Sequence, residues 1–392
     1  MARELRSPAT PGAPAFFHTA LIVESDRSVR DLLVPAVREA MAEADLVFLA
    51  VAAGTARLLR EELGPAADTF DWGDTAAFYQ RLGFTYEAFR RFLAAAHAAG
   101  RRVHVFAEPA LGGQPGSGPA GLSEPAGLSE PAGHSGSAGH SGHSGPAGPA
   151  GSAAVDRTAA YLAYEAICNE TYAGYGCEVT CLWDARRHPA PLIDSVRALH
   201  SHRLGPGGRE PSPGYVSPRA FLAGRNQHPL PLPLPVQADL AASLGCAEGL
   251  PALRAELRGL ARERGYAAPA VADVTMAVNE IATNGLSHGQ PPVEVRAWQH
   301  GDTLVVQVDD SGGIPLPAAG GYEPPDEHQE RTRGLWLARQ LADVVQTHTA
   351  GGTTSVRLYF PYELTHRRPP YLSGQYLSGQ YLSGQYLAGS SG

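Results

Sequence analysis

Three polar residues recur at helical spacing within the stretch 271–289. Glu280, Asn284 and His288 are each four residues apart, so on a helix they form one line along its length. Burying a carboxylate, an amide and an imidazole without partners costs free energy, so they are unusual beside an apolar seam. That seam has the same spacing and contains Val274, Val278, Ile281 and Gly285. The pattern indicates a helix that packs on a sheet and turns its polar edge to a ligand, although an ordinary amphipathic helix would also fit.

A second candidate is the pattern Asp310-x-Gly312 at the end of the expected strand TLVVQVDD. Asp310 shares one face of this strand with apolar residues, namely Leu304, Val306 and Val308. A carboxylate at the edge of such an apolar slot can accept a hydrogen bond from an exocyclic amine such as that of adenine. Gly312 would let a flat ring approach the backbone. A simple Asp-Ser-Gly-Gly turn would explain the same residues.

A third candidate, Arg333-Gly334-Leu335, begins an expected helix after the long loop 312–330. Backbone N–H groups and the positive dipole end at a helix start attract anions, and Arg331 and Arg333 would add charge. The pattern therefore suits phosphate binding. Each of the three patterns is weak alone, and their combination and order carry the argument.

The surrounding elements predict an α+β region over 238–362. Helices are expected at 250–265, about 268–287 and 333–350, and strands at 292–301, 303–313 and 353–361. This order favours helices on one face of an antiparallel or mixed sheet.

Residues 16–202 show a different rhythm, in which apolar strands alternate with amphipathic helices. Such alternation predicts an α/β domain with a mainly parallel sheet. The Gly/Pro/Ser/His-rich insert 112–154 has too little apolar surface to fold and is expected to be disordered. We expect flexible ends at 1–15 and 363–392, the latter a YLSGQ-repeat tail, and an extended Pro-rich linker at 203–237.

Composition narrows the class of protein. The formal net charge is −8, which argues against a general nucleic-acid or anionic-membrane binder. Four cysteines are too few for a disulfide framework, and no second Cys/His pair joins Cys177 and Cys181 at metal-like spacing. The first residues lack a signal-peptide core and no run of about 18 apolar residues occurs. We therefore expect a soluble cytoplasmic protein.

Taken together, the three C-terminal patterns resemble the GHKL (HATPase) fold, and most closely the anti-sigma-factor serine kinases of bacterial partner-switching systems. The stretches that carry the resemblance are EIATNGLSHG (280–289), RGLWLARQLAD (333–343) and GGTTSVRL (351–358). The resemblance covers about 238–362.

The resemblance implies ATP and Mg²⁺ as cofactors and assigns roles to the matching positions. Asn284 would ligate Mg²⁺, Glu280 would be the general base toward a serine hydroxyl, and Asp310 would bind adenine. His288 would shape the site, and the remaining nucleotide contacts would come from Gly312, Arg333, Gly334 and Leu335. The implied partners are a sigma factor and a STAS-type anti-sigma-factor antagonist, with a possible homodimer.

Two departures from the family pattern keep other functions open. Ile314 stands where the second glycine of D-x-G-x-G belongs, and Thr332 replaces the glycine before R-G-L. A non-catalytic sequestering module with degraded ATP loops is therefore an alternative to a protein serine/threonine kinase. A histidine kinase-like ATPase is a weaker alternative, because no two-helix segment with a phosphorylatable histidine is evident.

The N-terminal region resembles the MEDS sensory domain of actinobacterial regulators. The matching stretches are FFHTALIVES (16–25), HVFAEP (104–109), YEAICN (164–169) and CLWDARRHP (181–189). The chain lacks a G-x4-G-K-[ST] motif, so nucleotide hydrolysis is not expected there. Side chains at expected strand and helix ends are candidates for binding an unknown small-molecule signal, namely His18, Glu108, Glu165 and Asn169.

Overall fold

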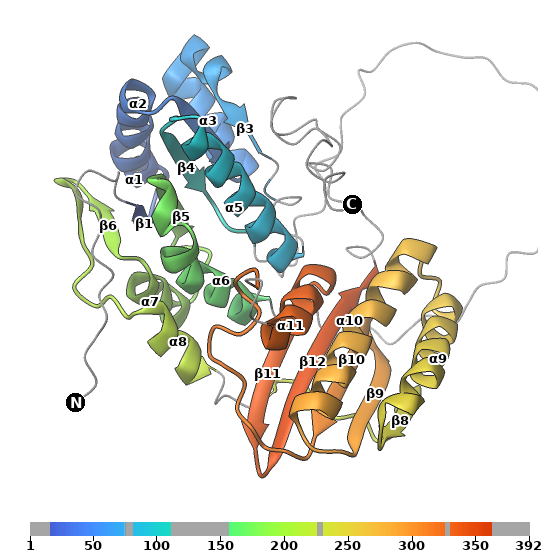
Figure 1. The fold of residues 1–392 in the computed structure, drawn as a ribbon. Helices are drawn as coiled ribbons and strands as arrows, with labels where there is room; N and C mark the ends of the chain where they lie inside the picture. Colours follow the sequence, from blue (N-terminus) through green and yellow to red (C-terminus); the bar gives the residue numbers. More distant parts are fainter. Residues whose placement is uncertain are drawn as a thin grey trace, which may run out of the picture.

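The computed structural model describes residues 16–73, 75, 81–110, 157–225, 230–325 and 330–362, without the side chains of residues 225 and 330–332. The expected leader 1–15, insert 112–154 and tail 363–392 lie outside the described residues. Figure 1 shows an N-terminal region and a C-terminal region, each built around one sheet, in contact with each other.

The N-terminal region alternates strands and helices, as expected. Its elements are β1 (Phe17–Val23), α1 (Asp26–Ser28), α2 (Val34–Glu43), β2 (Leu46–Ala50), α3 (Ala53–Leu63), β3 (Asp71–Trp72), α5 (Leu82–Ala98), β4 (Val103–Ala107), α6 (Thr158–Thr171), β5 (Glu178–Asp184), α7 (Ala190–Leu199), β6 (His202–Gly205), β7 (Gly208–Pro211) and α8 (Pro218–Arg225).

These strands form one sheet in the order β3-β2-β4-β5-β1-β6-β7. All its pairs are parallel except β6 with β7, which confirms the mainly parallel sheet. Strand residues alternate between two cores, as period-2 side chains must. Leu21 and Leu49 pack with α2 and α3 on one face, whereas Ala20 and Phe48 pack with α5 and α6 on the other.

The stretch 203–237 differs from the extended linker that its Pro and Gly content suggested. The β6–β7 hairpin begins at His202, directly after Ser201, and extends the first sheet beyond β1. The helix α8 follows and packs on α6. Glycines and prolines at the turn and strand ends do not prevent a two-stranded hairpin at a sheet edge. Irregular chain remains over the described residues 230–239.

The C-terminal region has helices on one face of an antiparallel sheet (Figure 1). Its elements are β8 (Leu240–Leu244), α9 (Leu250–Glu263), α10 (Ala268–His288), β9 (Val293–His300), β10 (Thr303–Asp310), α11 (Glu330–Leu341), β11 (Val344–Ala350) and β12 (Thr353–Pro361). The strand order is β11-β12-β10-β9-β8, and every described pair is antiparallel. The expected α+β class is confirmed.

The expected helix 333–350 is wrong in its second half. The helix α11 ends at Leu341, and the strand β11 begins at Val344. The backbone N–H of Asp343 donates to the Tyr359 carbonyl, which starts the pairing of β11 with β12. Val344, Val345 and the threonines that follow suit a strand, and ladder pairing decides between strand and helix here. The strand β8 was also not foreseen.

The two regions share apolar packing. Trp298, Val305 and Tyr359 lie on the face of the second sheet away from its helices, and they belong to the same core as residues of α5 and α6. Polar contacts cross the boundary as well, because Arg157 Nη2 donates to Asp343 Oδ1 over 2.7 Å. The helices α5 and α11 are in contact, and Figure 1 shows them side by side.

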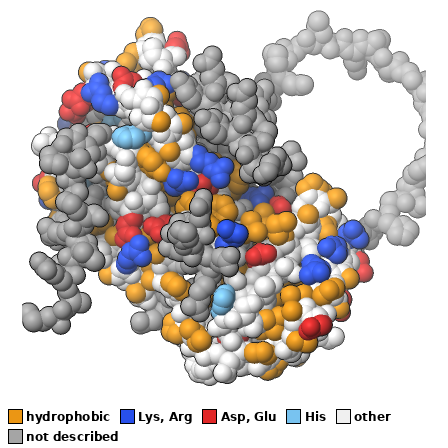
Figure 2. Space-filling model, in the orientation of Figure 1, with side chains coloured by type: hydrophobic (Ala, Val, Ile, Leu, Met, Phe, Trp, Pro, Cys, Tyr) orange, Lys and Arg blue, Asp and Glu red, His pale blue; other side chains and the backbone are white. Residues whose placement is uncertain are grey.

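The charged side chains of the described surface are mixed. On the face drawn in Figure 2, Arg side chains lie among Asp and Glu side chains over both regions. None of the described helices has the length and hydropathy needed to cross a bilayer.

Candidate functional site

The polar line of α10 meets the second turn of α11. Glu280 and Asn284 are half-buried, while Val278 and Ile281 on the neighbouring face are buried in the sheet-side core. A Cβ atom placed on Gly334 of α11 would lie 2.7 Å from Asn284 Nδ2 and 3.2 Å from Glu280 Oε2. A Cβ atom there would displace the end of the Asn284 side chain, whereas glycine lets α11 present bare backbone to the carboxylate and the amide.

The residues around Gly334 have separate environments. Arg333 is exposed, whereas Leu335 is buried in the core beneath α10 and α11. Arg333 and Gly334 remain candidates for nucleotide contacts, whereas the Leu335 side chain packs in the core and holds α11 against α10. His288 is the last residue of α10, and its side chain is exposed.

Asp310 lies at the end of β10, at the other end of the site. Its Oδ1 accepts a hydrogen bond of 2.9 Å from the Gly312 backbone N–H, which fixes the orientation of the carboxylate. A Cβ atom on Gly289, just after α10, would lie 2.4 Å from Asp310 Cγ. Burial raises the pKa of Asp310 above its ordinary value, against the opposing effect of backbone hydrogen bonds from Gly312 and Gln290. The structure thus brings the Asp310-x-Gly312 pattern to the C-terminal end of α10.

The loop after Asp310 keeps one glycine that its geometry requires. Gly313 has a positive φ of 59°, and a Cβ atom there would lie 2.8 Å from Gly352 Cα in the β11–β12 turn. The neighbouring Ile314 is exposed, with 54% of its surface accessible. The isoleucine therefore occupies a solvent-facing position while the adjacent glycine makes the close contact.

Comparison with known families agrees with this geometry. Residues 246–360 match the family model described as the histidine kinase-like ATPase domain. The matched segment runs from just after β8 to the penultimate residue of β12 and includes α10, β10 and α11. The C-terminal region is therefore a GHKL-like ATPase domain.

Two solved structures are among those similar to the chain. One is the RsbU and RsbW domains of Rv1364c from Mycobacterium tuberculosis, 22% identical, with 31% of this chain and 32% of that chain covered and a TM-score of 0.25. The other is the Acinetobacter baumannii histidine kinase AdeS, 8% identical, with 37% of this chain and 73% of that chain covered and a TM-score of 0.20. The chain thus spans 32% of the length of the first of these structures. No curated protein matches it.

The N-terminal candidates fall into two places. His18 and Glu165 meet in the core, with 3.4 Å between His18 Nε2 and Glu165 Oε2. Asn169 donates from Nδ2 to the Leu199 carbonyl over 3.0 Å. Glu108 lies elsewhere, where its Oε2 accepts from the Ala52 backbone N–H and its Oε1 lies 3.3 Å from Arg187 Nη1.

Two further residues of the His18 site escaped the sequence analysis. Cys181 Sγ is 3.4 Å from both His18 Nε2 and Glu165 Oε2, and His200 Nε2 is 3.4 Å from Glu165 Oε2. The sequence pairs Cys181 only with Cys177, and nothing in it singles out His200. No local spacing links residues 18, 165, 181 and 200, so no sequence signal short of the folded topology could have found this group.

Proposed function

We propose that the chain is an ATP-dependent regulator of the partner-switching type, in which the C-terminal domain acts as an anti-sigma factor and serine kinase. One observation carries this proposal: Glu280 and Asn284 of α10 lie against Gly334, in the second turn of α11. A carboxylate and an amide oxygen held together beside a helix backbone without a side chain are groups that can position a phosphoryl group, its metal ion and an acceptor.

The residues present fit ATP and Mg²⁺. Asn284 offers a hard oxygen ligand of the kind Mg²⁺ accepts, and Gly334 leaves a space that any Cβ atom would fill. Asp310 is held by Gly312 N–H through one oxygen, which leaves its carboxylate able to accept from an adenine amine. The exposed Arg333 adds positive charge beside the same part of α11.

In this proposal each residue has a definite task. Bound ATP with Mg²⁺ would supply the transferable phosphoryl group. Glu280 would accept the proton of a serine hydroxyl on the partner, because its carboxylate faces Gly334 of α11, where the phosphates would lie. Asn284 would position the metal, and Asp310 would select the base.

The N-terminal region would act as a MEDS-like sensory domain that receives a small-molecule signal. The implied partners are a sigma factor and a STAS-type antagonist, in a cytoplasmic setting and with a possible homodimer. The packing of α5 and α6 against the C-terminal domain supports this role. A structural change in the N-terminal region would alter the contacts that α11 makes with it.

The test is transfer of labelled phosphate by the full chain. The whole chain is needed because Trp298, Val305 and Tyr359 are covered by the N-terminal region and would be exposed in an isolated domain. Purified protein is incubated with Mg²⁺, γ-labelled ATP and purified STAS-type antagonists. Label on an antagonist serine, lost in Glu280→Gln while ATP binding stays, is the expected result.

Two other outcomes contradict parts of the proposal. ATP binding without transfer to any antagonist, unchanged by Glu280→Gln, identifies a sequestering module. That outcome would be traced to Ile314, which stands exposed where the family has glycine. Label on a histidine of the chain itself would instead identify a histidine kinase-like ATPase.

A further inference from the structure

Four side chains of types that can bind a metal ion come from separate parts of the chain and meet in the N-terminal core. They are His18 on β1, Glu165 on α6, Cys181 on β5 and His200 directly after α7, and all four are buried. One candidate ligand atom from each lies within 4.8 Å of the other three. We propose that these four residues bind a transition-metal ion, and that Zn²⁺ fits them best.

The separations match a tetrahedral site. A tetrahedron with metal–ligand bonds of about 2.0–2.3 Å has edges of about 3.3–3.8 Å. Four of the six edges measure 3.4 Å, and Glu165 Oε2 is common to three of them. The imidazole rings of His18 and His200 lie side by side, with centroids 4.0 Å apart. The ligand atoms therefore need little movement to surround one ion.

The hydrogen bonding of His200 leaves the lone pair of its Nε2 atom without a hydrogen-bond donor. Its Nδ1 lies 2.8 Å from the Val196 carbonyl oxygen, which can only accept, so Nδ1 must carry the proton. In the neutral ring Nε2 then has a lone pair that points toward the Glu165 carboxylate, and it has no hydrogen-bond partner among the described residues. Two acceptors facing each other in a dry core require either a proton or a metal ion between them. A backbone carbonyl that holds the second nitrogen is also the usual support of a metal-bound histidine.

Charge balance favours a divalent ion over a proton. Glu165 is a buried carboxylate, and an imidazole that binds a metal ion through a nitrogen lone pair does so in its neutral form. A divalent ion with one carboxylate, one thiolate and two neutral imidazoles gives a site of zero net charge. Such neutrality removes the large cost of an isolated buried charge.

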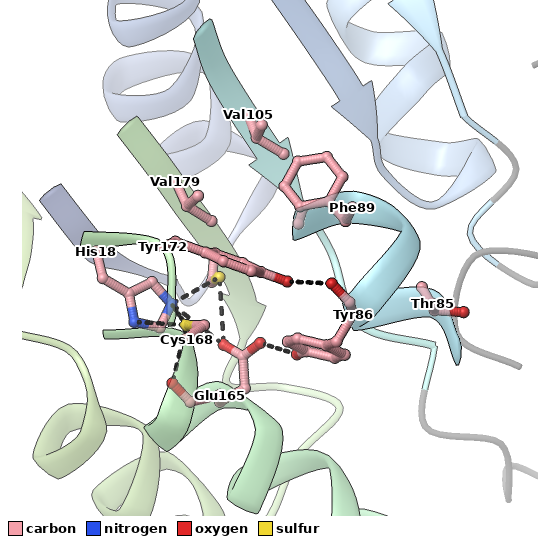
Figure 3. Close-up of a pocket in the computed structure, with 11 residues that line it drawn as sticks. His18, Thr85, Tyr86, Phe89, Val105, Glu165, Cys168, Tyr172 and Val179 are labelled. Carbon is pink, nitrogen blue, oxygen red and sulfur yellow. Dashed lines mark hydrogen bonds and ion pairs between the residues drawn. The ribbon is translucent and has the colours of Figure 1, made fainter. Parts of the chain in front are cut away.

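The ligand types select the metal. Thiolate and imidazole suit Zn²⁺ and related transition metals, whereas Mg²⁺ and Ca²⁺ prefer oxygen ligands throughout. The Tyr86 hydroxyl donates to Glu165 Oε1, so a neighbouring side chain orients this ligand. Figure 3 shows Tyr86 directed at Glu165, with His18 and Cys168 on the opposite side of the carboxylate.

A cavity of about 30 Å³ adjoins the cluster and is otherwise lined mainly by apolar side chains, among them Phe89, Val105 and Val179 (Figure 3). This volume admits a water-sized group. It is far too small for a nucleotide or an organic cofactor. The cluster is thus suited to an ion with at most one small additional ligand.

The test measures metal in the purified full chain. After dialysis against trace Zn²⁺, elemental analysis should find one zinc ion per chain. Replacement by Co²⁺ should give the visible bands of tetrahedral cobalt and the near-ultraviolet charge-transfer band of a cobalt–thiolate bond. Cys181→Ser and His200→Asn should each weaken Zn²⁺ binding by more than about 100-fold, beyond the loss caused by changing a ligand's hydrogen-bond partner.

Cys177→Ser is the matched control, because Cys177 is a buried cysteine outside the four-residue set. This variant should keep the zinc and the cobalt spectrum. If the ligand variants fail to fold, as judged by circular dichroism, the spectrum of wild-type protein decides alone. Wild-type protein that gives no cobalt–thiolate band, or that holds no more zinc than folded Cys181→Ser, would overturn the proposal.

Discussion

Tyr164 on α6 and Tyr322 in the loop after β10 meet edge to face, with ring centroids 4.9 Å apart and an interplanar angle of 74°. The guanidinium of Arg339 on α11 also lies over the Tyr322 ring, 3.8 Å from the ring centroid. Tyr164 precedes Glu165 of the buried cluster, and α11 carries Gly334. One aromatic ring therefore touches both helix α6 of the N-terminal region and the helix of the proposed nucleotide site.

Replacing this ring should loosen the contact between the two regions. Tyr322→Ala removes an aromatic pair and a cation–π contact, and we expect the free energy of unfolding to fall by about 1–3 kcal/mol. Tyr322→Phe keeps the ring and should cost less than half as much. Urea denaturation of the full chain measures both. Equal losses for the two variants would show that the hydroxyl, not the ring, makes the contact.

Asp343 should be a key polar residue of the boundary. Its Oδ1 accepts from Arg157 Nη2 over 2.7 Å and from the Arg81 backbone N–H over 3.0 Å, and its side chain is 1% exposed. Asp343→Ala leaves a nearly buried arginine without its carboxylate, so we expect a loss of about 3–5 kcal/mol.

The matched control for Asp343 is Asp194→Ala. Asp194 and Arg197 form an ion pair of similar length, 2.9 Å, but both side chains are exposed. Its removal should change the free energy of unfolding by no more than about 0.5 kcal/mol. Thermal and urea unfolding of both variants give the comparison. A small effect at Asp343 would mean that apolar packing alone holds the two regions together.

How far the sequence predicts this structure depends on how local the signal is. Periodicity placed α10 correctly, and period-2 alternation separated Val306 from Val305 on the two faces of β10. The run 333–350 failed because α11 and β11 are both apolar and only pairing with β12 separates them. The meeting of His18, Cys181 and His200 depends on strand order, since β1 pairs with β5 across a long sequence separation.

A pH dependence of stability should come from His104. Burial, with a smaller effect from Arg209, lowers the pKa of this ring from 6.5 to about 3. Between these values the unfolded chain binds the proton and the folded chain does not, so stability is complete above pH 6.5 and falls as the pH drops toward 3. At about 1.4 kcal/mol per pKa unit, the loss between pH 7 and pH 5 is about 2 kcal/mol.

His104→Gln should remove this contribution while keeping a polar group near Thr180, whose Oγ1 lies 3.0 Å from His104 Nε2. The free energy of unfolding is measured by urea denaturation at several pH values for both proteins. Between pH 7 and pH 5, the free energy of unfolding of the variant should fall by about 2 kcal/mol less than that of the wild-type protein. Parallel slopes would show that His104 takes up its proton in the folded state.

The space over Gly334 gives a steric prediction. Gly334→Ala would place a methyl group 2.7 Å from Asn284 Nδ2, so the thermal stabilisation by ATP and Mg²⁺ should be lost. Gly259→Ala on α9 is the control, because a Cβ atom there meets nothing within 4 Å. The control should keep the ATP effect and gain up to about 1 kcal/mol from the better helix former. A full ATP shift in Gly334→Ala would place the nucleotide elsewhere.

Calorimetric titration of the full chain with ATP tests the central claim most directly. We expect saturable binding of one ATP per chain in the presence of Mg²⁺, retained in Glu280→Gln because that carboxylate acts on the acceptor. Asn284→Ala should lose most of the Mg²⁺-dependent affinity. Absence of binding by folded wild-type protein, or unchanged Mg²⁺-dependent binding by Asn284→Ala, would contradict the assignment of α10, β10 and α11 as an ATP site.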